Sequence, residues 1–312
     1  MLKHLVPLVM APLAILTLSL LVCAQTASQS ASGGTPSQQK WNNVPPPNKS
    51  AYANQKSAPA PRRDLSGIWD AITEGGTQAK GVYEHPAVLP DHPQDELGGQ
   101  PDENNIPQPL PYTAVGLAAL KAHKTTVGVR AVDPSLTNDP VHTCDPEGFP
   151  RMELFELKVV QLVQTKNQVI LINQFNGRAR TIWTDGRELP DPKEVEPRWY
   201  GYSSGKWVDD YTFLVETVGM DERTWLDHAG RPHSSELKVE EQFHMADSDR
   251  LELTLTIDDP KSYTRPWMAL NKFVLHRLPD DFDRMEVFCS PSENAEYNEV
   301  VADPISNATP KK

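Results

Sequence analysis

The sequence lacks the markers of several common enzyme classes. Its 312 residues contain no serine nucleophile elbow, Walker loop or dinucleotide-binding fingerprint. They also lack the His-Glu-x-x-His and Cys-x-x-Cys spacings that mark many metal sites. We therefore expect neither a metal nor another cofactor.

Basic residues are too few and too scattered to indicate a nucleic-acid-binding protein. The chain has 30 Lys and Arg against 42 Asp and Glu, which gives a formal net charge of −12. No basic stripe is present to neutralise phosphates, and an anionic membrane surface would repel such a chain. We expect a small-molecule ligand or substrate as partner, no nucleic acid, and no stable membrane insertion once the N-terminal segment described next is removed.

Only one long apolar run is present, and it lies at the N-terminus. Lys3 precedes this run, residues 5–22, and Val22-Cys23-Ala24 fits a signal-peptidase cleavage pattern. The sequence thus predicts a signal peptide over residues 1–24 and a periplasmic or extracellular protein. A retained anchor and a lipoprotein attached through Cys23 are the alternatives, which the prolines of the run and Val22 before Cys23 disfavour.

Cysteine is scarce, with three residues in the whole chain. Cleavage would discard Cys23 and leave Cys144 and Cys289 in a compartment that permits oxidation. We predict that these two form a disulfide, with two buried free thiols as the alternative.

Composition divides the rest of the chain into three parts. Residues 25–62 are rich in Pro, Ser and Gln and predict a disordered tether. Residues 63–302 are expected to form a single β-barrel-like domain, and residues 303–312 a tail. Within the domain, residues 75–111 predict a loop or flap, and Thr113 is expected to cap a helix over residues 115–124.

Most of the domain is predicted to form strands, because it consists of segments rich in β-branched and aromatic residues that are bounded by turn residues. The predicted strands are 67–72, 154–165, 168–174, 178–184, 211–218, 237–245, 250–257, 268–277 and 284–289. Tight turns between successive strands favour an antiparallel meander, and closing it would remove its edges. The predicted fold is mainly β, a closed calycin- or lipocalin-like barrel with one short helix and long loops.

One hairpin has a register that the sequence itself predicts. Matching the apolar faces of residues 237–245 and 250–257 pairs Phe243 with Leu253 and Val239 with Ile257. In this register Glu241 falls on the apolar face, opposite Leu255. Glu241 is therefore the unusual residue of the hairpin.

Two resemblances extend this interpretation. The Gly67-Ile68-Trp69 segment resembles the Gly-x-Trp of lipocalins, which implies a calycin-like barrel with Arg277 or Lys272 packed over Trp69. IWTDGR at 182–187 and TIDDPKSYTRPW at 256–267, with further segments over residues 110–304, resemble an uncharacterised family of exported proteins of Acidobacteria-like soil bacteria. That likeness implies export and the extent of the domain, and transfers no catalytic residue.

A long polar connection between strands, residues 219–235, holds the first candidate site. His233, His228 and Asp227 could form an acid–base group, assisted by Asp221 and Glu222, because a carboxylate can orient an imidazole for proton transfer. The alternative is a structural loop in which Asp and Arg pair and Trp225 plugs the end of the barrel.

Arg180 and Glu241 form the second candidate. If the strand face that carries Arg180 points inward, the two would make either a buried structural ion pair or an anchor for a polar ligand.

The connection 258–267 is the third candidate. There Arg265 could hold an anion while Tyr263 donates a hydrogen bond and Trp267 stacks. The alternative is an ordinary turn braced by Asp259 and Arg265.

Two functions follow from these candidates. The first is a secreted barrel that binds a partly apolar small molecule. Its candidate lining residues are Trp69, Arg180, Trp183, Trp199, Tyr202, Trp207, Trp225, Tyr263, Arg265 and Trp267. The second is an extracytoplasmic hydrolase, lyase or isomerase in which His233 and Asp227 lead and Glu241 or Arg180 assist.

Overall fold

We analysed a computed structural model that describes residues 58–70, 110–126, 132–154, 159–227, 229–284 and 286–302. These residues all belong to one compact unit, Val44–Lys312. The predicted signal peptide, nearly all of the predicted tether and flap, the tail and His228 lie outside the described residues.

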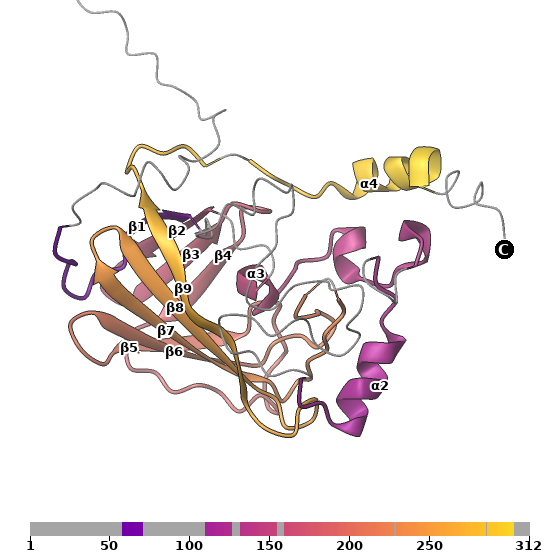
Figure 1. The fold of residues 1–312 in the computed structure, drawn as a ribbon, viewed down its shortest axis with the longest axis horizontal. Coiled ribbons are helices and arrows are strands. Elements are labelled where there is room, and N and C mark those ends of the chain that lie inside the picture. Colours follow the sequence, from indigo (N-terminus) through magenta and orange to yellow (C-terminus); the bar gives the residue numbers. More distant parts are fainter. Residues whose placement is uncertain are drawn as a thin grey trace, which may run out of the picture. The chain divides into compact units, whose positions relative to one another are not determined.

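Nine strands form a closed barrel in which each strand pairs with its neighbours in the sequence and β9 returns to β1 (Figure 1). The strands are β1 (Gly67–Asp70), β2 (Val159–Gln164), β3 (Gln168–Asn173), β4 (Ala179–Trp183), β5 (Tyr202–Trp207), β6 (Thr212–Val218), β7 (Lys238–Asp247), β8 (Arg250–Asp258) and β9 (Trp267–Leu278). The predicted mainly-β barrel is confirmed.

All neighbouring strands are antiparallel except β4 and β5, which run parallel. The expected meander is therefore interrupted once, and closure explains why. Strands that alternate in direction around a ring close only if their number is even, so a ring of nine needs a parallel pair. The parallel pair is also short, since it joins only Ile182 to Ser203 and Trp183 to Ser204. Residues 184–201 form the crossover connection that a parallel pair requires.

The predicted β7–β8 register is confirmed. Val239 pairs with Ile257, Phe243 with Leu253, and Glu241 with Leu255. Alternate residues of both strands are buried, so the apolar face points into the barrel and carries Glu241 with it.

Several strand predictions need correction. Residues 202–207 form β5, which was not predicted. Of the predicted strand 284–289, the described residues make one isolated bridge, between Val287 and Phe175, and form no strand. The strand predicted from Leu154 begins at Val159, because Leu154 ends helix α3.

The helices are separate from the nine strands that form the barrel wall. They are α2 (Ala114–Ala122), α3 (Arg151–Leu154) and α4 (Pro291–Tyr297), with short turns η2 (Pro134–Leu136), η3 (Pro140–Thr143) and η4 (Asn298–Ala302). Thr113 caps α2 as predicted, since its hydroxyl accepts a hydrogen bond of 3.0 Å from the Gly116 amide. No helix among the described residues is long and apolar enough to cross a membrane.

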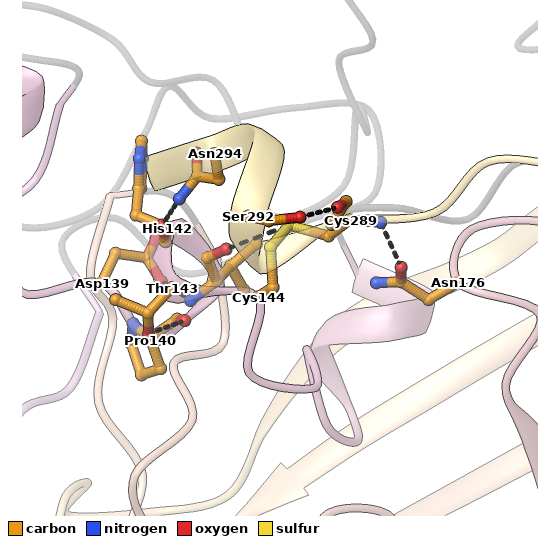
Figure 2. The surroundings of a disulfide bond; sticks show 11 residues. Asp139, Pro140, His142, Thr143, Cys144, Asn176, Cys289, Ser292 and Asn294 are labelled. Carbon is orange, nitrogen blue, oxygen red and sulfur yellow. Dashed lines mark hydrogen bonds between the residues drawn. A yellow bond between two sulfur atoms is a disulfide. The ribbon is translucent and has the colours of Figure 1, made fainter. Parts of the chain in front are cut away.

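The predicted Cys144–Cys289 disulfide is present and joins the end of η3 to the segment before α4 (Figure 2). Hydrogen bonds flank it on both sides. The Cys289 amide donates to the Asn176 side chain at 2.7 Å, and the Asn294 side chain donates to the His142 carbonyl. The C-terminal segment is thereby attached both to η3 and to the β3–β4 turn.

Large side chains fill the barrel interior. Trp69, Leu171, Phe213, Phe243 and Leu255 belong to one continuous buried cluster. The indole of Trp69 donates to the Leu65 carbonyl at 3.1 Å, and the guanidinium of Arg277 lies 5.8 Å from its ring, whereas Lys272 is exposed. The interior around Trp69 is therefore a packed core.

Candidate functional site

A pocket of about 570 Å³ lies against the short β4–β5 pair, and every residue that lines it falls between Ala179 and Ser204. The lining side chains come from β4, the crossover connection and β5. They are Ala179, Arg180, Thr181, Trp183, Arg187, Glu188, Leu189, Pro190, Pro197, Arg198, Trp199, Tyr200, Tyr202, Ser203 and Ser204, together with Gly201. Because strand residues alternate between faces, the exposed or half-buried Ala179, Thr181, Trp183, Tyr202 and Ser204 place most of the pocket on the outer face of the barrel.

Hydrogen bonds hold the crossover connection over this face. The Tyr202 hydroxyl donates to the Glu196 carbonyl at 2.9 Å, and the Ser204 hydroxyl donates to the Arg187 carbonyl at 3.0 Å. The backbone of Arg198 exchanges hydrogen bonds of 3.0 Å with Gly219 and Asp221 at the end of β6. The pocket is thus largely pre-formed, as small-molecule sites usually are.

Aromatic rings and arginine side chains alternate around the pocket. Arg187 lies 3.5 Å from the centroid of the Trp183 ring, and Arg198 lies 4.0 Å from that of Tyr202. Arg223, which is outside the lining, lies 4.4 Å from the Trp199 ring. Cation–π contacts of this kind fix the orientation of both partners.

Tyr200 adds a phenol to the wall of the pocket. Burial, and then the negative charge of Glu147, raise the pKa of Tyr200 above its ordinary value. The phenol is therefore protonated at neutral pH and is able to donate a hydrogen bond.

Arg180 lies where the pocket meets the barrel interior. It is buried, yet it contributes to the pocket lining together with Ser203, because β4 and β5 separate beyond their two paired residues. Its Nη1 donates to Glu241 at 2.8 Å and to Glu153 of α3 at 2.9 Å, while its Nη2 donates to Thr217 at 2.8 Å. The predicted proximity of Arg180 and Glu241 is thus found, and Glu153 is a partner that the sequence did not indicate.

The two carboxyl groups of this cluster differ in their surroundings. Burial, followed by the charge of Glu241, raises the pKa of Glu153 well above its ordinary value, although Arg180 acts in the opposite direction. Oε2 of Glu153 accepts no hydrogen bond from the described residues. The neutral, protonated form of Glu153 is favoured, so the charges of Arg180 and Glu241 balance each other inside the barrel.

The structure does not bring His233 and Asp227 together. Nε2 of His233 bonds to the Thr224 hydroxyl at 2.6 Å, while Asp227 forms a buried ion pair with Arg231. Burial lowers the pKa of His233, and the carboxylates whose charge partly offsets this effect are those of Asp259, Glu222 and Asp221.

Trp225 lies in the same connection, buried, with its ring stacked on His123 at 4.4 Å. The connection 219–235 therefore has the bonding of a packed structural loop, and neither His233 nor Asp227 lines the pocket against β4 and β5.

The connection 258–267 does not assemble the third candidate. Arg265 is exposed, whereas Tyr263 and Trp267 are buried, with their rings 5.4 Å apart. The Tyr263 hydroxyl donates to the Pro232 carbonyl at 2.8 Å. Asp259 accepts hydrogen bonds of 2.7 Å from the amide and the hydroxyl of Ser234, so its bonding partner is Ser234 and not Arg265.

Of the ligand-binding residues expected from the sequence, Arg180, Trp183, Trp199 and Tyr202 therefore meet in one pocket. Trp69, Trp225, Tyr263 and Trp267 are buried, and Trp207 packs against Phe213 with ring centroids 5.3 Å apart. Among the described residues, no group of three or more His, Cys, Asp or Glu side chains is placed to hold a metal ion.

Comparison of the chain with protein-family models, curated proteins and solved structures gives no match. The functional argument therefore depends on the geometry of the chain itself.

Proposed function

We propose that this protein is an exported small-molecule-binding barrel whose ligand site is the pocket against β4 and β5. The observation that carries the proposal is the pocket itself. Its volume of about 570 Å³ falls within the range of ordinary ligand sites, and four aromatic side chains line it. Trp183, Trp199, Tyr200 and Tyr202 are all only partly exposed, so a bound ring could cover them further.

Export is part of the proposal. The Cys144–Cys289 disulfide is compatible with an oxidising compartment, as is the predicted signal peptide. The resemblance to exported proteins of soil bacteria has the same implication. The resemblance to lipocalins is a weaker guide, because the proposed site lies on the flank of the barrel.

An acid–base enzyme is the alternative. It is less well supported, because His233 and Asp227 bond to different partners and neither lines the pocket.

Intrinsic fluorescence tests the proposal directly, since two of the seven tryptophans line the pocket. Phenolic compounds, lipids and sugars would be titrated into the full chain and into Trp183→Phe and Trp199→Phe. We expect saturable quenching by at least one class of compound, reduced in both variants. Trp207→Phe is the matched control, because Trp207 is also half-buried on β5 but lies outside the pocket. A flat response to every class would contradict the proposal.

A further inference from the structure

The charge of the pocket differs from that of the whole chain. Acidic residues outnumber basic ones 42 to 30 over the sequence. Among the pocket-lining residues, in contrast, there are three arginines, Arg180, Arg187 and Arg198, and a single carboxylate, Glu188. The pocket lining is therefore richer in basic than in acidic residues, and its arginines account for the difference.

Two of the three arginines are already neutralised. Arg180 pairs with Glu241 inside the barrel. Arg187 pairs with Asp185 through contacts of 2.7 and 2.9 Å. Arg198 is different, because no carboxylate of the described residues lies within ion-pair distance of it, and its side chain is exposed. Arg198 is therefore the pocket arginine that pairs with no carboxylate of the described residues, and Glu188 is the one carboxylate that shares the lining with it.

Arg198 is also held in a defined place. Its guanidinium lies 4.0 Å from the Tyr202 ring, and the hydroxyl of that ring is bonded to the Glu196 carbonyl at 2.9 Å. The Arg198 backbone is bonded to Gly219 and Asp221. Binding a ligand usually costs conformational entropy, because a long side chain must become ordered. These contacts already order Arg198 in the protein without ligand, so that entropy loss is smaller here.

The shape of the lining indicates the rest of the ligand. The guanidinium groups of Arg187 and Arg198 lie over the Trp183 and Tyr202 rings. A guanidinium is itself flat, and a planar conjugated ring stacks on it better than a flexible chain does. The edge of a guanidinium carries N–H groups whose geometry matches a carboxylate or sulfonate.

We propose that the pocket selects planar aromatic anions, with the Arg198 guanidinium binding the anionic substituent. This inference rests on the proposed ligand-binding function and adds the chemical class of the ligand. Glu188 opposes it mildly, as the only carboxylate of the lining.

A matched pair of dyes measures the contribution of the negative charge to binding separately from that of the aromatic ring. Anilinonaphthalene sulfonate carries a planar naphthalene ring and a negatively charged sulfonate, and its fluorescence rises in apolar sites; N-phenylnaphthylamine is its uncharged counterpart. We expect the full chain to bind the sulfonate dye about tenfold more tightly than the neutral dye, as one charge-assisted contact allows. High salt should reduce only the difference between the two.

Three variants localise the effect. Arg198→Gln should bring the affinity for the sulfonate dye down to that for the neutral dye, and Glu188→Gln should raise it modestly. Lys206→Gln is the control, because Lys206 is an exposed cation of β5 outside the pocket, and its affinities should match those of the full chain.

The outcomes separate this inference from the proposed function. Equal affinity for the two dyes, or an unchanged difference in Arg198→Gln, would overturn the anion selectivity while leaving a pocket that binds aromatic rings. No fluorescence rise with either dye, together with flat tryptophan titrations, would overturn both.

Discussion

Arg180 of β4 and Glu241 of β7 form a buried ion pair in the barrel core, with two contacts between the guanidinium and the carboxylate. Both side chains come from strands whose other inward residues are apolar. The Arg180 guanidinium also lies 3.6 Å from the Phe149 ring. The pair thus anchors the segment before α3, and α3 itself through Glu153, to the end of the barrel.

Breaking this pair on one side should be costly. Arg180→Met would leave Glu241 buried without its cation, and we expect it to lower the free energy of unfolding by about 3–5 kcal/mol. The double variant Arg180→Met/Glu241→Leu should recover most of that loss, because it leaves no buried charge unpaired. Urea unfolding curves measure both changes. Additive losses in the double variant would show that the two side chains act independently.

The raised pKa of Glu153 predicts a specific pH dependence of stability. Above the ordinary pKa of a glutamate, the unfolded chain releases this proton while the folded protein retains it, so stability falls as pH rises until Glu153 ionises in the folded state. Glu153→Gln cannot ionise and should lack this decline. The lowered pKa of His233 has the opposite effect, because it reduces stability as pH falls. This effect is the same in the unmodified protein and in Glu153→Gln.

The measurement is the difference between the unfolding free energies of the two proteins from pH 4 to 9, which isolates Glu153. Glu240→Gln, an exposed change on β7, is the control. A difference that stays constant with pH would contradict a raised pKa.

The disulfide should contribute strongly to stability. It joins residues 145 apart, and on the chain-entropy account a loop of that length stabilises the folded state by up to about 5 kcal/mol. We expect Cys144→Ser/Cys289→Ser to lose about 2–5 kcal/mol, and dithiothreitol to lower the Tm of the full chain to that of the variant. If dithiothreitol exposes two reactive thiols without changing the Tm, the bond is not a stabilising element.

Gly205 of β5 should not tolerate a methyl group. A Cβ at this position would lie 2.4 Å from Cζ of Phe213 and 2.8 Å from Cγ2 of Ile182. Alanine normally improves on glycine within a strand, yet here we expect Gly205→Ala to cost about 1–3 kcal/mol through overpacking. Thermal unfolding measures the loss, and adding Phe213→Leu should relieve part of it. A gain in Tm for Gly205→Ala alone would refute the close contact.

Gly205 also explains why β5 escaped prediction. The strand reads Tyr-Ser-Ser-Gly-Lys-Trp, and its inward positions hold Ser203 and Gly205 instead of large apolar residues. Ser203 accepts hydrogen bonds from Arg180, and Gly205 leaves room for the Phe213 ring. Local periodicity cannot reveal a strand whose inner face is small because distant side chains occupy the space.

The β7–β8 hairpin shows the opposite case. Apart from Glu241, its strands alternate between apolar and polar residues, so only one register buries the apolar set, and that register is found. The same argument identified Glu241 as the polar exception and Arg180 as a candidate partner. The sequence did not indicate Glu153, because it lies in a one-turn helix, Arg151–Leu154, that was not predicted and whose last residue was interpreted as the start of a strand.

The pocket itself could not be derived from the sequence. It depends on the parallel β4–β5 pair and on a proline-rich crossover connection without periodicity. Closure of nine strands requires one parallel pair, but the strand pattern does not show which pair it is, and β5, one of its two members, was not among the predicted strands. The sequence identified Trp183 and Arg180 as candidates. It could not show that they share a pocket with Arg198 and Tyr200, because that proximity arises only in the tertiary structure.

The central claim is that the ligand binds on the flank of the barrel, and indole NMR signals test it most directly. Each tryptophan gives one Nε1–H signal, which single substitutions to phenylalanine would assign. During titration with a ligand that quenches fluorescence, we predict that the signals of Trp183 and Trp199 shift while that of Trp69, bonded to Leu65 in the barrel core, stays in place. Shifts at Trp69 and Trp267 with Trp183 and Trp199 unmoved would place the ligand inside the barrel and contradict the account.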